Sequence, residues 1–234
     1  LRFELESVKP FLREGDIVIL SPEYHNILGQ LHSGEMLVQI VALYPNTLKY
    51  FSTGNEFWQL IRAFPAVHTG AIRNMLEDLK LRHCLVCANR EPIYNRAAFD
   101  KATGDVIINE AVAKRDIPLE LNLPFNVESK EFSESINLMN SFARDAAANK
   151  ITVFFYYPSS VNVINDPTAR ILEQLGTRLR NELTFPIINS LKDSQYGDEY
   201  MFDTAYHLNK AGKEINTHRL GKHLCETDLS LPCK

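Results

Sequence analysis

Two runs of consecutive apolar residues constrain most strongly how this chain can fold. The first is Asp16-Ile-Val-Ile-Leu20, and its unbroken β-branched character predicts a central parallel strand that is buried on both faces. The second is Ile151-Thr-Val-Phe-Phe-Tyr-Tyr157, which predicts another strand. Each run ends in a turn, Ser21-Pro22 after the first and Pro158-Ser159-Ser160 after the second.

Helical periodicity alternates with these strands. A short strand is expected at Phe185–Ile188. Helices are expected over Leu1–Val8, Phe132–Asn149 and Pro167–Leu183, the last with Asp166 as its cap. A final helix is expected to run from an N-cap at Asn209 to Leu224. The last helix has an imperfect apolar stripe, formed by Ala211, Ile215, Leu220 and Leu224. This alternation predicts an α/β fold, a three-layer α/β/α arrangement with a mainly parallel sheet, in a single domain over residues 1–234.

The middle of the chain departs from this order. Residues 32–81 are predicted to be mainly helical and to form an insertion or a lid over the sheet. Their aromatic residues, such as Phe57 and Trp58, are expected in a core. Residues 84–124 read as a long irregular segment with a short strand at Val106–Ile108.

Composition excludes several classes of function. The net charge is −4 and there is no long basic run, so the electrostatic footprint of a nucleic-acid binder is missing. No apolar segment approaches the roughly 20 residues that span a bilayer. The chain begins inside an amphipathic helix, which predicts a preceding segment and leaves open membrane attachment through it.

The four cysteines allow more than one reading. Cys84 and Cys87 have redox or metal spacing, but no second such pair completes a zinc site, and no metal or organic cofactor is expected. Cys225 and Cys233 are the easiest pair to join across the polar tail. Two disulfides and buried free thiols both remain open, as does a redox function for Cys84 and Cys87.

An Asp and a His lie close together just before the last helix. In Phe202-Asp203-Thr-Ala-Tyr-His207-Leu-Asn-Lys-Ala-Gly212, Asp203 and His207 belong to a polar loop, where catalytic side chains are commonly presented. A carboxylate beside an imidazole fixes the ring tautomer, which a histidine that acts as a general base requires. The alternative is an Asp that caps a turn and a His that packs under the helix.

This block resembles the C-terminal block of the SGNH/GDSL hydrolases, in the form D-x-x-x-H-L-N-x-x-G of envelope-associated bacterial members. The resemblance implies that Asp203 and His207 are two members of a Ser-His-Asp triad. It also implies that the end of the first strand contributes to the oxyanion hole or contacts substrate. The candidates there are Glu23, Tyr24, His25 and Asn26, where His25 or Asn26 would donate a hydrogen bond.

A serine nucleophile is not apparent. There is no Gly-Asp-Ser or Gly-x-Ser-x-Gly motif. Ser21 is followed by Pro22, which has no N–H for an oxyanion hole. Nothing marks Ser159 or Ser160 as activated. The resemblance places the serine before Leu1.

The resemblance thus implies an extracytoplasmic ester hydrolase or O-acyltransferase that acts on a small-molecule or glycan acyl ester of the bacterial envelope. The common superfamily spacing is Asp-x-x-His, whereas Asp203 and His207 are one residue further apart. A non-catalytic binding or assembly module with the same fold therefore remains the alternative.

Overall fold

The computed structural model describes residues 1–28, 41, 45–50, 57–58, 60–62, 65, 100, 102, 119–123, 126–163 and 166–227. The chain divides into two compact units. One comprises Leu1–Gly29 with Asn109–Lys234, and the other comprises Gln30–Ile108. All named strands and all candidate site residues belong to the first unit. The single domain expected from the sequence stays a prediction.

Short parallel strands form the centre of the first unit. Strand β1 (Ile17–Leu20) pairs in parallel with β2 (Thr152–Phe155), so that both strands end at the same edge. A parallel bridge joins Phe155 to Ile187, and β3 (Ser160–Val161) pairs in parallel with β4 (Gln195–Tyr196). The structure therefore confirms a mixed α/β fold with parallel strand pairing, whereas the three-layer arrangement stays a prediction.

The ladder between β2 and the segment after Ile187 is completed by a side chain. The Asn189 amide oxygen accepts a hydrogen bond from the Tyr157 N–H at 2.6 Å, and its amide nitrogen donates to the Tyr157 carbonyl at 3.1 Å. Asn189 is buried, so this pairing satisfies backbone groups that water does not reach. The predicted strand at Phe185–Ile188 is thus reduced to a single bridge, at Ile187.

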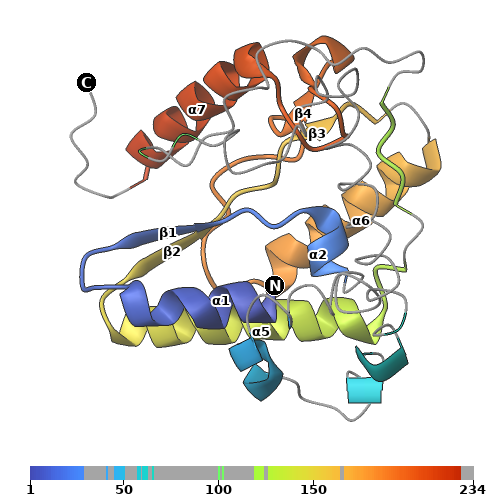
Figure 1. Ribbon diagram of the computed structural model, residues 1–234. Helices are drawn as coiled ribbons and strands as arrows, with labels where there is room; N and C mark the ends of the chain where they lie inside the picture. The colour runs from blue at the N-terminus through green and yellow to red at the C-terminus, as the bar shows by residue number, and fades with distance from the viewer. Residues whose placement is uncertain are drawn as a thin grey trace, which may run out of the picture. The chain divides into compact units, whose positions relative to one another are not determined.

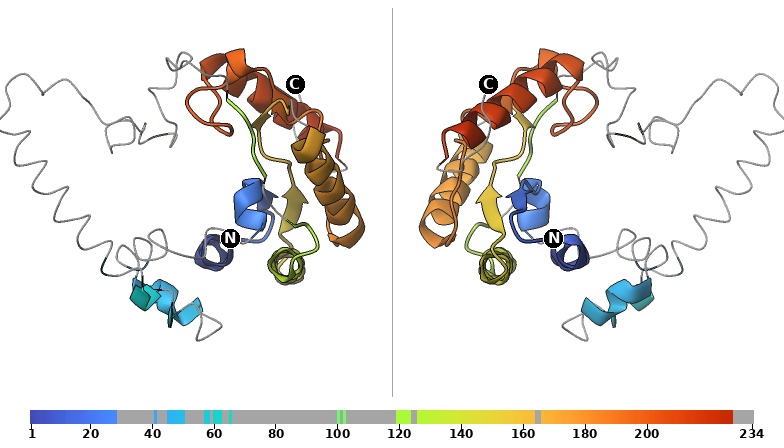
Figure 2. Two further views of the ribbon diagram at one scale, coloured as in Figure 1. Left: turned by 90° about the vertical axis from the view of Figure 1, so that its right-hand side faces the viewer. Right: turned by 90° about the vertical axis from the view of Figure 1, so that its left-hand side faces the viewer.

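Helices flank the strands within this unit. They are α1 (Arg2–Val8), η1 (Lys9–Phe11), α2 (Tyr24–Ile27), α5 (Lys130–Ala148), α6 (Asp166–Glu182), η5 (Asp198–Tyr200) and α7 (Lys210–Cys225). In Figures 1 and 2, α1 and α5 lie side by side, and Figure 2 shows α2 and α6 on opposite sides of the β1–β2 pair.

The boundaries of α5 follow from its caps. The Ser129 hydroxyl accepts a hydrogen bond from the Phe132 N–H, so the helix begins at Lys130, two residues before the expected start. It ends at Ala148, and Lys150 beyond it adopts a left-handed φ of 58°. The Ile151 N–H then donates to the Ala146 carbonyl, the hydrogen bond that closes a Schellman-type helix end.

Helix α7 packs on the strands through polar contacts. The Asn216 side-chain oxygen accepts hydrogen bonds from the Tyr156 hydroxyl at 3.0 Å and the Tyr196 hydroxyl at 2.9 Å. The Arg219 guanidinium lies 5.0 Å from the centre of the Tyr196 ring. The imperfect apolar stripe contributes through Ile215, which packs against the hydrophobic core, while Gly212 is the one fully buried residue of α7. Ala211 is exposed, and the other members of the stripe are half-buried: Ile215, Leu220 and Leu224.

The described residues of the second unit are mainly helical, as expected. They include the 3-10 helix η3 (Pro45–Tyr50) and helical residues at 57–58, 60–62 and 65. Phe57 and Trp58 are 46% and 52% exposed, so the expectation that they are buried in a core is wrong. The Arg62 guanidinium covers the Trp58 ring at 5.4 Å and makes that exposure less costly.

Other expectations for the middle of the chain lie outside the described residues, among them the strand at Val106–Ile108 and the positions of Cys84 and Cys87. Within the part that the structure describes, no helix is both long enough and apolar enough to cross a membrane.

Candidate functional site

Asp203 and His207 lie on a tight hairpin between η5 and α7. An antiparallel bridge joins Met201 to Leu208, and the Phe202 N–H donates to the His207 carbonyl at 2.6 Å. At the tip, the Thr204 hydroxyl accepts hydrogen bonds from the backbone N–H of residue 206 at 3.3 Å and of His207 at 3.2 Å. This turn folds the chain back, so that side chains four positions apart meet.

The two side chains form a hydrogen-bonded pair. Asp203 Oδ1 lies 2.9 Å from His207 Nδ1, and the side chains are 20% and 42% exposed, respectively. A proton on Nδ1 that is donated to the carboxylate leaves the basic lone pair of the neutral ring on Nε2. This is the tautomer that a general base needs, and the exposure of His207 keeps the pair accessible to a substrate. The extra residue between Asp and His therefore does not prevent the pairing.

The base of the hairpin is held by the first turn of α7. The Asn209 side-chain oxygen accepts from the Gly212 N–H at 3.0 Å, its amide nitrogen donates to the Glu199 carbonyl at 2.7 Å, and its backbone N–H donates to the Tyr200 carbonyl at 2.9 Å. A Cβ at position 212 would lie 2.5 Å from the Tyr200 carbonyl oxygen. The Leu-Asn-x-x-Gly part of the motif is therefore structural, since Asn209 caps the helix and Gly212 permits its close approach.

The other side of the hairpin is tied to β3. The Ser159 hydroxyl donates to the Tyr206 carbonyl at 3.1 Å, and the Val161 N–H donates to the Ala205 carbonyl at 2.8 Å. Because Ser159 follows β2, the hairpin lies beyond the carboxyl end of that strand. This is the edge where open α/β sheets bind their ligands.

Tyr206 connects the hairpin to the end of β1. Its ring lies edge-on to the His25 ring, with 5.6 Å between centroids, and 6.1 Å from the Tyr24 ring. Burial raises the pKa of the Tyr206 hydroxyl well above its ordinary range, and the Tyr24 phenol and the Glu23 carboxylate raise it further. The structure thus brings Glu23, Tyr24 and His25 near Tyr206 of the hairpin, whereas an oxyanion or substrate role for this strand end stays a prediction.

The candidates at the end of β1 differ in their surroundings. Tyr24 is fully buried, whereas Glu23, His25 and Asn26 are half-buried. Glu23 is the N-cap of α2, and its backbone carbonyl accepts from the Asn26 N–H at 2.9 Å. Tyr24 and His25 contact the hairpin directly through Tyr206. Tyr206 itself carries no signal in the sequence, because a tyrosine inside a loop reads as an ordinary aromatic residue.

The surroundings of three described serines near the strand ends do not suit a nucleophile. Ser159 donates its proton to a backbone carbonyl, and Ser160 is fully buried. Ser21 is exposed and precedes Pro22, so the next residue offers no N–H to an oxyanion. None of these three serines is therefore assigned as a nucleophile.

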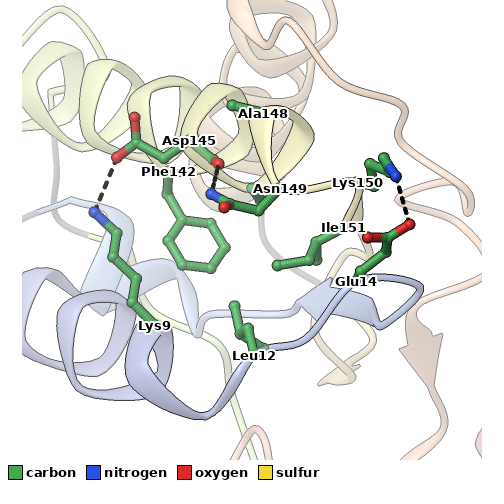
Figure 3. Close-up of a pocket in the computed structure, with 10 residues that line it drawn as sticks. Lys9, Leu12, Glu14, Phe142, Asp145, Ala148, Asn149, Lys150 and Ile151 are labelled. Carbon is green, nitrogen blue, oxygen red and sulfur yellow. Dashed lines mark hydrogen bonds and ion pairs between the residues drawn. The ribbon is translucent and has the colours of Figure 1, made fainter.

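A cavity of about 430 Å³ lies near the opposite, amino ends of the strands (Figure 3). Its apolar lining includes Phe142 and Ile151. Its charged groups pair with one another, Lys9 with Asp145 at 3.0 Å and Lys150 with Glu14 at 2.6 Å. The cavity lining includes no serine, cysteine or histidine, so it does not match the candidate site.

In the part of the chain that the structure describes, no group of three or more potential metal ligands gathers. The redox candidates Cys84 and Cys87 lie outside that part. Cys225 is disulfide-bonded, so the free-thiol reading is wrong for this residue, and its partner is one of the three cysteines outside the described residues. The pairing of Cys225 with Cys233 stays a prediction.

Comparison with known proteins adds no further constraint. The chain matches no protein-family model, no curated protein and no solved structure. The site therefore has to be interpreted from its own geometry.

Proposed function

We propose that this protein is an SGNH-type ester hydrolase or O-acyltransferase that acts on an acyl ester, with an envelope glycan as the favoured carrier. The observation that carries the proposal is the 2.9 Å contact between Asp203 and His207 Nδ1 on an accessible hairpin beyond the parallel strands. A surface ion pair alone would not need that location or that ring orientation.

In the proposed mechanism His207 acts first as a base and then as an acid. Nε2 takes the proton of a serine hydroxyl as the serine oxygen attacks the acyl carbonyl, and it then gives this proton to the leaving alcohol. Water or an acceptor alcohol attacks the acyl-enzyme next, and its proton passes by the same route back to the serine. Asp203 stabilises the imidazolium in both halves, and no metal or organic cofactor takes part.

The end of β1 has the second role in the proposal. His25 or Asn26 supplies a donor to the oxyanion, and Glu23 and Tyr24 shape the wall of the site. The contact of His25 with Tyr206 supports this assignment, because it links the end of β1 to the residue next to His207. The disulfide at Cys225 supports an extracytoplasmic location, where disulfides persist.

The test is hydrolysis of a chromogenic acetyl ester and of an O-acetylated glycan by the intact protein and its variants. His207→Ala should lower kcat by about 10³-fold or more, and Asp203→Asn should lower it by a similar factor through the wrong ring tautomer. The matched control is His223→Ala. His223 also pairs its Nδ1 with a carboxylate, that of Glu226 at 3.6 Å, but it lies on α7. Equal losses in His207→Ala and His223→Ala would contradict the assignment.

The alternative is a non-catalytic binding or assembly module. It is favoured by the surroundings of the described serines, of which Ser159 is engaged with a carbonyl and Ser160 is buried. This alternative predicts that no ester is turned over and that the His207→Ala variant retains binding of an acylated glycan.

A further inference from the structure

We propose that Tyr206 is a positioning residue whose ring fixes the His207 hairpin against the end of β1, so that His207 and the His25 segment act as one site. This inference rests on the proposed function for its kinetic test. It goes beyond that function in naming a residue that no motif marks. The juxtaposition itself stands on the ring and backbone contacts of the structure.

The position of Tyr206 in the chain allows its side chain to influence the orientation of His207. It is the residue immediately before His207, and the Thr204 hydroxyl accepts a hydrogen bond from the backbone N–H of each. Its carbonyl accepts from the Ser159 hydroxyl. A shift of the Tyr206 side chain would therefore rotate the peptide that carries His207.

The ring of Tyr206 reaches across to a segment about 180 residues earlier in the chain. It lies at 74° to the His25 ring and at 59° to the Tyr24 ring, which are favourable edge-to-face and tilted geometries for aromatic pairs. Tyr24 is fully buried at the start of α2, so its ring is a fixed support. The hairpin thus rests on a rigid element rather than on another loop.

The hydroxyl of Tyr206 contributes less than the ring. Its oxygen is buried and makes no hydrogen bond of standard geometry with the described residues. Although the Tyr24 backbone partly offsets the effect of burial on its pKa, the pKa remains raised, so the group stays protonated at any working pH. Removing the hydroxyl alone deletes no hydrogen bond of standard geometry with the described residues, so it should leave the fold intact.

Two substitutions of Tyr206 distinguish the contribution of its ring from that of its hydroxyl. Tyr206→Phe keeps the ring and should retain kcat within about twofold, whereas Tyr206→Leu removes the ring contacts and should lower kcat by about 10-fold to 100-fold with little change in KM. Tyr196→Leu is the control, because it removes another tyrosine ring, which is more deeply buried than that of Tyr206 and contacts Arg219 under α7. It should reduce stability without lowering the kcat of the folded protein.

A spectroscopic measurement tests the inference independently of turnover. The His207 Nδ1 proton shared with Asp203 should give a low-field proton NMR resonance in the wild type and in Tyr206→Phe. The same resonance should shift or broaden by exchange in Tyr206→Leu. An unchanged resonance in Tyr206→Leu, or an equal effect in Tyr196→Leu, would overturn the positioning role. A wild type that shows the resonance but hydrolyses no ester would instead refute only the proposed function.

Discussion

Gly212 and Gly221 lie on the same helix, and replacing each with alanine should change stability in opposite directions. A Cβ at position 212 would lie 2.5 Å from the Tyr200 carbonyl oxygen and 2.9 Å from the Leu208 side chain. A Cβ at position 221 would meet no atom within 4 Å. The two variants therefore share the gain in helix propensity, and only Gly212→Ala meets a steric conflict.

The magnitudes follow from these two effects. Alanine stabilises an exposed helix interior by about 0.5–1 kcal/mol relative to glycine, so Gly221→Ala should be more stable than the wild type by that amount. Overpacking typically costs about 1–3 kcal/mol, and the backbone oxygen of Tyr200 cannot swing away as a side chain would. Gly212→Ala should therefore be less stable by roughly 1–2 kcal/mol after the propensity gain is included.

The assay is urea unfolding followed by far-ultraviolet circular dichroism, with the free energy of unfolding extrapolated to zero urea. The difference between Gly221→Ala and Gly212→Ala should be about 1.5–3 kcal/mol. Because the hairpin base is held by this helix turn, Gly212→Ala should also broaden the His207 resonances. Equal stabilities for the two variants would refute the close approach of α7 to Tyr200.

Two further predictions concern residues of the first unit that lie outside the candidate site. Arg178 donates to both carboxylate oxygens of Glu182 and to the Val127 carbonyl, so Arg178→Met should lower the free energy of unfolding by about 2 kcal/mol. The Arg178 hydrogen bond lowers the pKa of Glu182 below its ordinary value of 4.5, so the associated stability is present above that value and is lost as the pH falls through the lower folded-state pKa. Stability measured from pH 7 to pH 2 should therefore fall more steeply in acid for the wild type than for Arg178→Met, and parallel curves would contradict the pairing. Lys150 has a left-handed φ of 58°, so Lys150→Gly should stabilise the protein by about 1 kcal/mol in thermal unfolding. Gly15 has a φ of 89°, so Gly15→Ala should destabilise the protein by a similar amount. A stabilised Gly15→Ala and a destabilised Lys150→Gly would contradict these backbone angles.

Local patterns in the sequence predicted much of the frame. The strands at 17–20 and 152–155 and the helices α5, α6 and α7 were predicted because burial and helical periodicity depend on neighbouring residues, whereas the short helix α2 was not predicted. The Asn209 cap was confirmed in its geometry, since a cap depends on residues within one turn. The pairing of Asp203 with His207 was implied by the family resemblance, and the structure shows the two side chains in contact.

Contacts between distant segments could not be predicted in this way. The packing face of α7 includes the polar Asn216 because the Tyr156 and Tyr196 hydroxyls lie beneath it, and neither tyrosine is near α7 in the sequence. The contact of Tyr206 with His25 also depends on how the strand ends meet in space. Exposure of Trp58 was missed because an aromatic residue at helical spacing reads as core.

The most direct test of the central claim is the labelling of the intact protein with a fluorophosphonate probe, followed by mass spectrometry of the whole chain and of its peptides. The account predicts a single adduct on a serine, whose rate of formation falls at least about 100-fold in His207→Ala and is unchanged in His223→Ala. An absent adduct, or one that forms equally fast without His207, would contradict a catalytic role for the Asp203/His207 pair.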